Sequence, residues 1–337
     1  MSMFKKALFF TDIHFGMKSN SRQHNQDCLA FVEWAVEMGK KHACATCVFL
    51  GDWHHNRASV NVSTLNYSVQ AIDALSAGFD SVVMIPGNHD EHYRDTRDMN
   101  SIVWVKKYDN IRFYNDMQVV EDVAVVPWLV GDEYKRVGKL DAQYMFGHFE
   151  LPHFYMNAMV QMPDHGELKR EDFVAPERVF TGHFHKRQHH KNINYIGNAF
   201  PHNYADAHDD ERGVMIMEWG GTEEYHAWPD APKFRKYKLG DILTNTDVLL
   251  QPNMYCRVEI DVDISYEEAN FIKEQFIPQY GLRELSLIPR TAEVDLSTAV
   301  EGELNFESVD SIVTSHLTQL ESAQYDSNLM LDIYRNL

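Results

Sequence analysis

Short apolar runs in this chain repeatedly end in residues that can bind a metal ion. Five segments show the pattern in sequence order: LFFTDIH, VFLGDWHH, VVMIPGNHD, YMFGHFE and VFTGHFH. Each run has the length of a buried strand, and each is followed by a tight turn that carries carboxylate, amide or imidazole groups. The sequence therefore requires a fold in which several strands are buried and their polar ends lie close together.

The spacing of the first three segments predicts strand–helix–strand units. Asp12, Asp52 and Asn88 lie 40 and 36 residues apart, which leaves room for a helix that crosses over between two parallel strands. Apolar residues recur at helical spacing within residues 29–36 and 65–75, in the intervals between the segments. Because polar groups that follow parallel strands meet at the carboxyl edge of a sheet, we expect these clusters to lie together.

Beyond residue 110 the pattern indicates a second sheet. Residues 111–126 contain short β-like runs separated by polar turns, which predict a hairpin ahead of Pro127. The stretches 194–196 and 214–219 are expected to add strands to this second sheet. The sequence thus predicts an α/β fold in which a two-sheet sandwich is flanked by helices.

After a mixed linker, the chain contains a compact β-α-β pattern. Residues Tyr255–Asp263 alternate like a strand, and the stretch LRELSLI returns as a second one. Ser265 and Glu268 form a capping box ahead of a helix over Tyr266–Phe276, and Gly281 ends that helix. The last part of the chain predicts two short amphipathic helices, which either pack on their own domain or dock on another protein.

Composition excludes two classes of protein. No apolar run approaches the roughly 20 residues that a transmembrane helix needs, so we expect a soluble, cytoplasmic protein with no membrane partner. The four cysteines are too few and too scattered for a disulfide framework, and we expect reduced thiols. Cys44 and Cys47 form a C-x-x-C pair without the further ligands of a structural zinc site, so we interpret them as buried residues.

The net charge of −19 argues at first against a nucleic-acid partner, because phosphates are bound by Lys and Arg. The distribution of charge weakens this objection. Residues 246–337 contain 17 acidic and 5 basic residues, so most of the excess acid lies in the C-terminal part. Carboxylates that face bound cations would also be neutralised locally.

The residue types in the clusters suit hard or borderline divalent ions, since they offer carboxylate, amide oxygen and imidazole and no thiolate. A single D-x-H or G-D pair often occurs by chance, whereas GNHD and GHFH are more specific and the ordered set is more specific still. The candidate ligands are Asp12, His14, Asp52, Asn88, His148, His183 and His185. Their number suits two ions that share a bridging carboxylate.

The ordered set D-x-H, GD, GNHD, GH and GHxH resembles the calcineurin-like metallophosphoesterase superfamily. Within it the chain resembles the SbcD/Mre-eleven-type DNA repair nucleases, and most closely the phage T4-type recombination nuclease subunits. The segments that carry this likeness are GDW at Gly51–Trp53, GNHDEHY at Gly87–Tyr93 and YIG at Tyr195–Gly197. The resemblance covers residues 7–220.

This resemblance implies two divalent metal ions, most simply Mn²⁺, with Mg²⁺ or Fe²⁺ as alternatives. Asp52 would bridge them. The implied ligand sets are Asp12, His14, Asp52 and His185 for one ion, and Asp52, Asn88, His148 and His183 for the other. By the same family pattern, His89 assists catalysis without binding metal, Asp90 orients its ring, and His55 is a second active-site histidine.

The resemblance also implies three parts: a dimetal phosphoesterase (nuclease) domain at 1–245, a small α+β capping-like domain at 246–298, and a C-terminal helical partner-binding segment at 299–337. The leading hypothesis is a DNA exonuclease/endonuclease that acts at DNA ends with a Rad-fifty/SbcC-like ATPase, bound through the C-terminal helices. A homodimer is a further family expectation, with residues 65–75 and 99–108 as the candidate surface.

Two alternative functions remain open from the sequence. One is a metallophosphoesterase for small phosphodiesters or phosphoproteins. Phosphoprotein phosphatases, however, typically have the motifs GDxVDRG and GNHE, whereas this chain has GDWHHNR and GNHD. The other is a non-catalytic scaffold that binds DNA ends, which would predict that some of the metal ligands are replaced by other residues.

Histidines outside the motifs are expected to be structural or exposed: His153, His165, His189, His190, His202 and His208. Basic residues that flank the clusters are interpreted as solvated loop charges: Lys18, Arg22, Arg57, Lys186 and Arg187.

Overall fold

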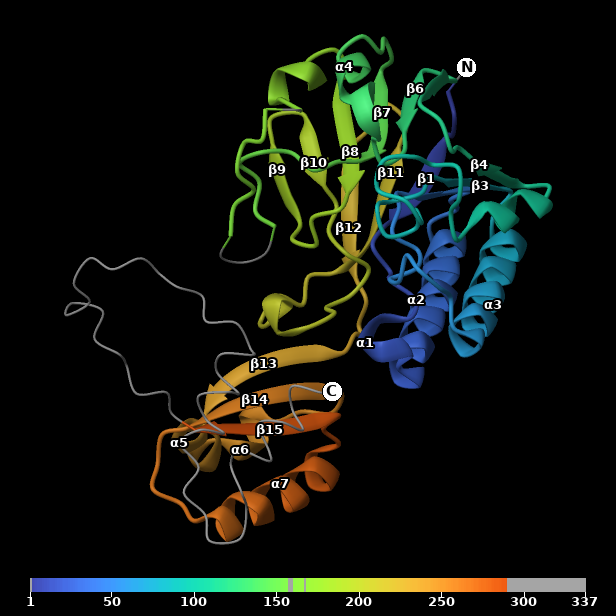
Figure 1. Cartoon of the computed structure of the whole chain (residues 1–337). Coiled ribbons are helices and arrows are strands. Elements are labelled where there is room, and N and C mark those ends of the chain that lie inside the picture. Colours follow the sequence, from blue (N-terminus) through green and yellow to red (C-terminus); the bar gives the residue numbers. More distant parts are fainter. Residues whose placement is uncertain (1, 157–159, 167, 290–337) are drawn as a thin grey trace, which may run out of the picture. The chain divides into compact units, whose positions relative to one another are not determined.

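The N-terminal part of the chain alternates between strands and helices, as its apolar spacing predicts. In the computed structural model, which describes residues 2–156, 160–166 and 168–289, the parallel strands β1 (Lys6–Phe10), β2 (Thr46–Phe49) and β3 (Ser81–Met84) are neighbours. The crossover helices α2 (Arg22–Lys41) and α3 (Val62–Gly78) lie side by side against this sheet (Figure 1). The short α1 (Met17–Asn20) precedes α2.

The first sheet has six strands in the order β12-β11-β1-β2-β3-β4. Both β4 (Ile111–Phe113) and β11 (Gly213–Glu218) belong to it, so the expectation that these stretches join the second sheet is wrong. Side chains of β11 alternate between the two cores that flank this sheet, so both faces of the strand are buried. It is antiparallel to β1 and to the edge strand β12 (Glu223–Ala227).

The second sheet also has six strands, in the order β5-β6-β7-β8-β10-β9. The predicted hairpin before Pro127 is confirmed as the antiparallel pair β5–β6, and the strand predicted at 194–196 is confirmed as β10. Strands β6, β7, β8 and β10 are mutually parallel. The bounds are β5 (Gln118–Val120), β6 (Val123–Val126), β7 (Tyr144–His148), β8 (Arg178–Gly182), β9 (Gln188–His190) and β10 (Ile193–Tyr195).

An aromatic core lies between the two sheets. Phe9 of the first sheet packs edge-on against Phe146 of the second, with ring centroids 5.1 Å apart, and Phe180 lies 5.8 Å from Phe9. Each such ring is fully buried and contributes on the order of 2 kcal/mol of transfer free energy. A second core fills the space between the first sheet and its helices, and a third covers the outer face of the second sheet. The sandwich flanked by helices is thus present.

Short helical turns complete this part of the chain. They are η1 (Val103–Lys107), η2 (Gly131–Glu133), α4 (Tyr134–Val137), η3 (Arg170–Phe173) and η4 (Tyr204–Asp206). All four cysteines are buried and unpaired, as expected of structural thiols. Among the described helices, none combines the length and apolar character needed to cross a membrane.

The predicted β-α-β pattern forms part of a small parallel sheet in the order β13-β14-β15. The capping box of Ser265 and Glu268 is present, and Gly281 ends the helix in a left-handed conformation with φ 61°. The elements are β13 (Lys233–Lys238), α5 (Leu239–Thr244), α6 (Thr246–Leu249), β14 (Met254–Ile260), α7 (Tyr266–Tyr280) and β15 (Glu284–Pro289). The described residues belong to one compact unit, Met1–Arg290, and the helices expected within 299–337 lie outside them.

Candidate metal centre

The predicted ligands meet at the carboxyl ends of strands from both sheets. Asp12, Asp52 and Asn88 follow β1, β2 and β3 of the first sheet. His148 ends β7, and His183 follows β8 of the second sheet. Strands from two sheets therefore deliver side chains to one edge of the sandwich, which is where an α/β fold places its sites.

One group of ligand atoms is formed by Asp12, His14 and His185, which lie within 4.8 Å of one another. Nε2 of His14 is 3.2 Å from Nε2 of His185 and 3.9 Å from Oδ1 of Asp12. Nε2 of His185 is also 3.9 Å from Oδ1 of Asp12. The three donors thus surround one small space, as ligands of a common ion would.

A second group is formed by Asp52, His148 and His183, with Asn88 among them. The amide oxygen Oδ1 of Asn88 lies 3.1 Å from Nε2 of His148 and 3.0 Å from Nδ1 of His183. Oδ2 of Asp52 is 3.4 Å from Nε2 of His148 and 3.7 Å from Nε2 of His14 in the first group. Asp52 therefore lies between the two groups, within 4 Å of an imidazole of each.

The backbone at the ligand positions is unusual. Asp12, His14, Asp52 and His183 have φ values of 51°, 54°, 61° and 89°, a region that residues other than Gly rarely adopt. Each such conformation costs roughly 1–2 kcal/mol. Hydrogen bonds between the turns hold it, because the backbone N–H of Asp12 donates to the carbonyl of Gly51 at 3.0 Å and that of His14 donates to the carbonyl of Asp52 at 3.1 Å.

The close approach of these turns requires glycine at two positions. A Cβ on Gly87 would lie 2.2 Å from Oδ1 of Asp52, and a Cβ on Gly51 would lie 2.5 Å from Nδ1 of His148. Gly51 also has a φ of 99°. The glycines of the GDW and GNHD motifs therefore make room for the ligands themselves.

Asp90 is bonded to the backbone of the ligand turns. Its Oδ2 accepts hydrogen bonds from the N–H groups of Asp52, Trp53 and Gly87 at 2.9, 3.2 and 2.9 Å, and its Oδ1 accepts one from His54 at 2.9 Å. The carboxylate is fully buried, and burial together with the Asp52 charge raises the pKa of Asp90 to about 7. The printed bonds of Asp90 thus go to the backbone of the ligand turns, and among the described residues no hydrogen bond joins it to the ring of His89.

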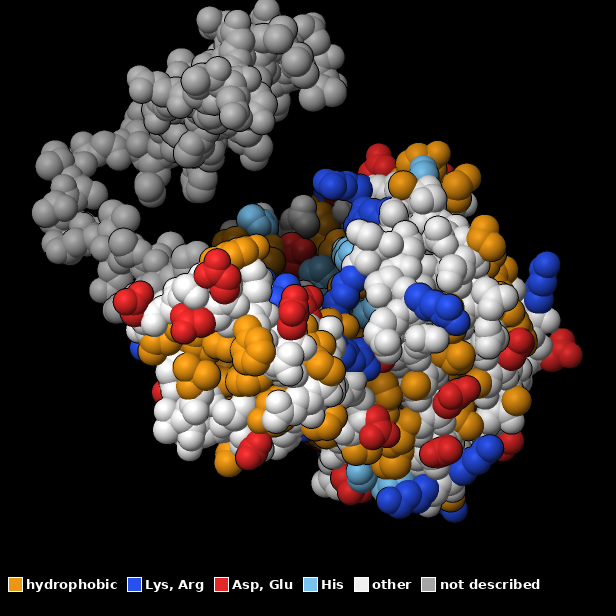
Figure 2. Space-filling model, turned by 90° about the horizontal axis from the view of Figure 1, so that it is seen from below, with side chains coloured by type: hydrophobic (Ala, Val, Ile, Leu, Met, Phe, Trp, Pro, Cys, Tyr) orange, Lys and Arg blue, Asp and Glu red, His pale blue; other side chains and the backbone are white. Residues whose placement is uncertain are grey.

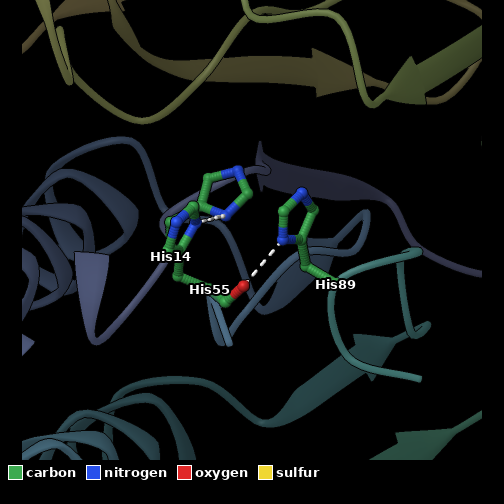
Figure 3. Close-up of side chains that lie close together, drawn as sticks. All are labelled: His14, His55 and His89. Carbon is green, nitrogen blue, oxygen red and sulfur yellow. Dashed lines mark hydrogen bonds between the residues drawn. The ribbon is translucent and has the colours of Figure 1, made fainter. Parts of the chain in front are cut away.

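The ring of His89 is instead held by a backbone carbonyl (Figure 3). Nδ1 of His89 lies 2.7 Å from the carbonyl oxygen of His55. Because a carbonyl can only accept, Nδ1 carries the hydrogen and Nε2 is left available. The rings of His89 and His55 stack with centroids 5.1 Å apart, and Nδ1 of His55 is 3.4 Å from Nδ1 of His14. Both histidines thus adjoin the first ligand group.

Electrostatic coupling is strongest around Asp52. Burial alone would raise the pKa of Asp52, but the imidazoles of His148 and His14 outweigh it and hold the pKa well below its ordinary range. Burial lowers the pKa of His148, but the Asp52 carboxylate opposes it and raises that pKa to about 9. Burial keeps the pKa of His14 well below its ordinary value despite Asp52. A cation that replaced the proton on His148 would face the same negative charge.

Sequence reasoning missed several residues that support the ligands. Nε2 of His202 donates to the carbonyl of Asp12 at 2.8 Å, and Nε2 of His24 donates to the carbonyl of His14 at 3.0 Å. Oε2 of Glu150 lies 3.1 Å from Nε2 of His183, which turns Nδ1 of that ring toward Asn88. Burial lowers the pKa of His24 to about 4 and that of His202 well below its ordinary value, so both rings are neutral.

A signal for two of these residues was present in the sequence. Glu150 belongs to the segment YMFGHFE, two residues after the predicted ligand His148, and His202 follows the strand β10 as the predicted ligands follow their strands.

The basic residues near the clusters mostly contact other side chains. Lys18 lies over the ring of Tyr255 at 4.1 Å, and Arg187 lies over that of Tyr225 at 4.6 Å.

The donor set fits divalent cations. Carboxylate, amide and imidazole groups make up both ligand groups, and the buried site contains no thiolate among the residues that the structure describes. Second-layer hydrogen bonds fix which ring nitrogen faces the centre, since Nδ1 of His148 donates to the carbonyl of Leu50 at 2.8 Å and leaves Nε2 toward Asp52. Such outer partners are characteristic of metal-binding histidines.

Comparison with known proteins agrees with this geometry. Residues 5–214 match the family described as calcineurin-like phosphoesterase. The chain is 25% identical over 308 residues to "Exonuclease subunit 1" of Enterobacteria phage T4, and the alignment covers 88% of each protein.

Two solved structures are more distant. Nuclease MPE of Pseudomonas putida has a TM-score of 0.32 at 16% identity, over 64% of this chain and 84% of that one. The protein TT1561 of Thermus thermophilus has a TM-score of 0.40 at 11% identity, over 67% of this chain and 99% of that one. The family match covers more than half of the chain and contains every predicted ligand. The chain therefore belongs to the calcineurin-like phosphoesterase family and is a metallophosphoesterase, a hydrolase of a family that uses divalent metal ions.

Proposed function

We propose that this protein is a dimetal-dependent DNA nuclease that hydrolyses phosphodiester bonds at DNA ends. The observation that carries the proposal is the convergence of two ligand groups on Asp52, at the position of a bridging carboxylate. The similarity to a phage exonuclease subunit over 88% of the chain directs the choice of substrate toward DNA. A scaffold without catalysis is disfavoured, since no ligand is missing.

The proposed ligand assignment follows the two groups. The ions are held by Asp12, His14, Asp52 and His185, and by Asp52, Asn88, His148 and His183. Two bound cations would supply Lewis-acid activation of the phosphate and stabilise the charge of the transition state. Mn²⁺ is our proposed physiological ion because oxygen and imidazole donors without thiolate suit it.

His89 is the proposed general acid. Its Nδ1–H is committed to the carbonyl of His55 at 2.7 Å, which fixes the ring and leaves Nε2 to exchange a proton with the substrate. In the imidazolium form, Nε2–H would donate to the leaving alkoxide as the P–O bond breaks. His55 stacks on this ring and holds it in place through its backbone carbonyl, so we assign His55 a positioning role.

A groove beside His89 is suited to the DNA backbone. Its lining includes Gly16, Asn56, Arg57 and the two histidines His55 and His89. The side chain of Arg57 is partly exposed and lines this groove, so its guanidinium can bind a phosphate that enters it. Figure 2 shows Lys and Arg side chains around a hollow in the surface, with histidine side chains visible inside it.

The proposal includes partners. The phage relative is named as a subunit, and we propose that this chain likewise acts with a Rad-fifty/SbcC-like ATPase in recombination and double-strand-break repair, bound through residues 299–337. We further propose a homodimer through the surface of α3 and η1. Leu65, Met99 and Val103 are 40%, 55% and 46% exposed there, which supports an apolar contact.

A nuclease assay on linear duplex DNA with Mn²⁺ tests the proposal. We expect His89→Ala to slow cleavage by about 10²- to 10⁴-fold, the usual worth of a general acid. Asp52→Ala should abolish cleavage because it removes the shared carboxylate. His189→Ala replaces an exposed histidine outside the site and should cut like the wild type.

The outcomes separate the parts of the proposal. Undiminished cleavage by both His89→Ala and Asp52→Ala would show that the assigned site is wrong. Hydrolysis of bis(p-nitrophenyl) phosphate without cleavage of DNA, even with an ATPase partner present, would overturn the DNA substrate and leave the metal site standing.

A further inference from the structure

A second group of potential ligands lies outside the metal centre. His42, Glu224 and His226 each offer one ligand atom, and these atoms lie within 4.8 Å of one another. The two imidazole centroids are 4.6 Å apart, and Nε2 of His226 is 3.3 Å from Oε1 of Glu224. The group shares no residue with the proposed nuclease site. His42 precedes β2, whereas the bridging Asp52 follows that strand.

His42 is held at the end of α2 by a complete Schellman motif. The N–H of Cys44 donates to the carbonyl of Gly39 at 2.8 Å, and the N–H of Ala43 donates to the carbonyl of Lys40 at 3.2 Å. Ala43 has a φ of 56°, where such motifs usually have Gly. The chain therefore turns sharply after His42, and the position of this imidazole is set by backbone hydrogen bonds.

Glu224 and His226 belong to β12, the edge strand of the first sheet. Residues two apart in a strand share a face, so both side chains point to the side on which His42 lies. The ladder with β11 fixes their register, with Glu224 opposite Ile216 and His226 opposite Val214. The side chain of Glu224 is 67% exposed and that of His226 is 21% exposed, so the carboxylate is the side from which an ion reaches the group.

Two ring nitrogens of this group lack hydrogen-bond partners among the described residues. Nε2 of both His42 and His226 is buried without a hydrogen-bond partner in the described part of the chain, although His226 is within ion-pair distance of Glu224. Two ring nitrogens with no satisfied hydrogen bond beside a carboxylate form an incomplete polar cluster.

We propose that His42, Glu224 and His226 bind one transition-metal ion of the zinc class, separate from the nuclease centre. Two imidazoles and one carboxylate are a known donor set for zinc, with water in the remaining position. Ligand atoms around tetrahedral zinc lie about 3.3 Å apart, so the present spacing needs only small side-chain rotations. The ion links β12, an edge strand of the first sheet, to the end of α2 and so holds this edge of the sheet in place.

Zinc stoichiometry tests this site directly. The metal-free, tag-free protein is dialysed against micromolar Zn²⁺ and its metal content is measured, for the wild type, His226→Ala and the control His189→Ala. We expect His226→Ala to bind one ion fewer than the wild type, and His189→Ala to bind the same number. Because the result is a difference, ions at the nuclease centre cancel, and cleavage of DNA by His226→Ala should be unchanged.

A second variant and a stability readout complete the test. Glu224→Gln keeps both imidazoles and should weaken Zn²⁺ binding at this site without unfolding the protein. Zn²⁺ should raise the unfolding temperature of the wild type more than that of His226→Ala, since binding to the folded state stabilises it by mass action. Equal zinc content in the wild type, His226→Ala and Glu224→Gln would overturn the proposal, as would an equal loss in His189→Ala.

Discussion

Replacing Asp90 by Asn tests how the ligand turns are held. The carboxylate accepts four backbone N–H bonds, three at Oδ2 and one at Oδ1. In the least disruptive orientation, the amide oxygen of Asn keeps the three bonds of Oδ2 and its NH₂ group faces the N–H of His54. The N–H of His54 and the facing NH₂ group then both lack an acceptor, at about 1–3 kcal/mol for the lost bond, and the other bonds lose their charge assistance.

These losses amount to about 2–4 kcal/mol, and removal of the buried charge that raises the pKa of Asp90 offsets part of them, so we expect a net loss toward the lower end of this range at pH 8. Asp90→Ala would leave all four amides unpaired and cost roughly 4–12 kcal/mol, which approaches the whole stability of a domain. Asn is thus the informative change. Urea unfolding of the metal-free proteins measures it at pH 8, where a carboxyl with a pKa of about 7 is ionised. Asp95→Asn, an exposed change in the following loop, is the matched control.

Metal affinity provides the second readout. The N–H of His54 belongs to the turn that carries the predicted ligand Asp52, so loss of its bond should disturb that turn and weaken Mn²⁺ binding by about 10- to 100-fold, as loss of an outer partner usually does. Excess Mn²⁺ should then restore much of the activity. A variant with wild-type urea midpoint and wild-type Mn²⁺ affinity but slower turnover would refute the reasoning and return Asp90 to the ring of His89.

Further predictions follow from the same site. Single-turnover cleavage by His89→Ala should be slow at saturating Mn²⁺ while calorimetry shows unchanged metal stoichiometry; a lost ion would instead make His89 a ligand. Glu150→Gln should weaken Mn²⁺ binding by about 10- to 100-fold through His183, and an unchanged titration would remove Glu150 from the site. Burial lowers the pKa of His54 to about 3. The unfolded chain therefore binds more protons between pH 6.5 and 3, and acidification to pH 5 should cost about 2 kcal/mol through this residue. Urea midpoints of His54→Gln should depend less steeply on pH, and an unaltered slope would contradict this account.

Much of the metal centre was predictable because it is local in sequence. Asp12, Asp52 and His148 each lie at the end of an apolar strand, and parallel strands bring their carboxyl ends to one edge without further information. The helical intervals and the β-α-β pattern were predictable for the same reason, since periodicity and capping residues are properties of neighbouring residues.

What could not be predicted depends on distant contacts. The strands β4 and β11 have short apolar patterns that suit either sheet, and their pairing with distant strands decided their place. The hydrogen bond from His202 to Asp12 spans 190 residues, so its role was invisible to spacing. Asp90 belongs to the GNHD motif, but its partners are backbone amides that no side-chain pattern reveals.

The left-handed turns at the ligand positions also limit how this site can change by mutation. At Asp12 and Asp52 the backbone has φ values of 51° and 61°, which Asn and Gly adopt readily and β-branched residues do not. A substitution to Asn keeps both the turn and an oxygen donor, so the centre can weaken gradually, whereas Val or Ile would disrupt the turn and the ligand together. We therefore expect that the first substitutions to appear at these two positions, when catalysis is lost in evolution, are to Asn or Gly.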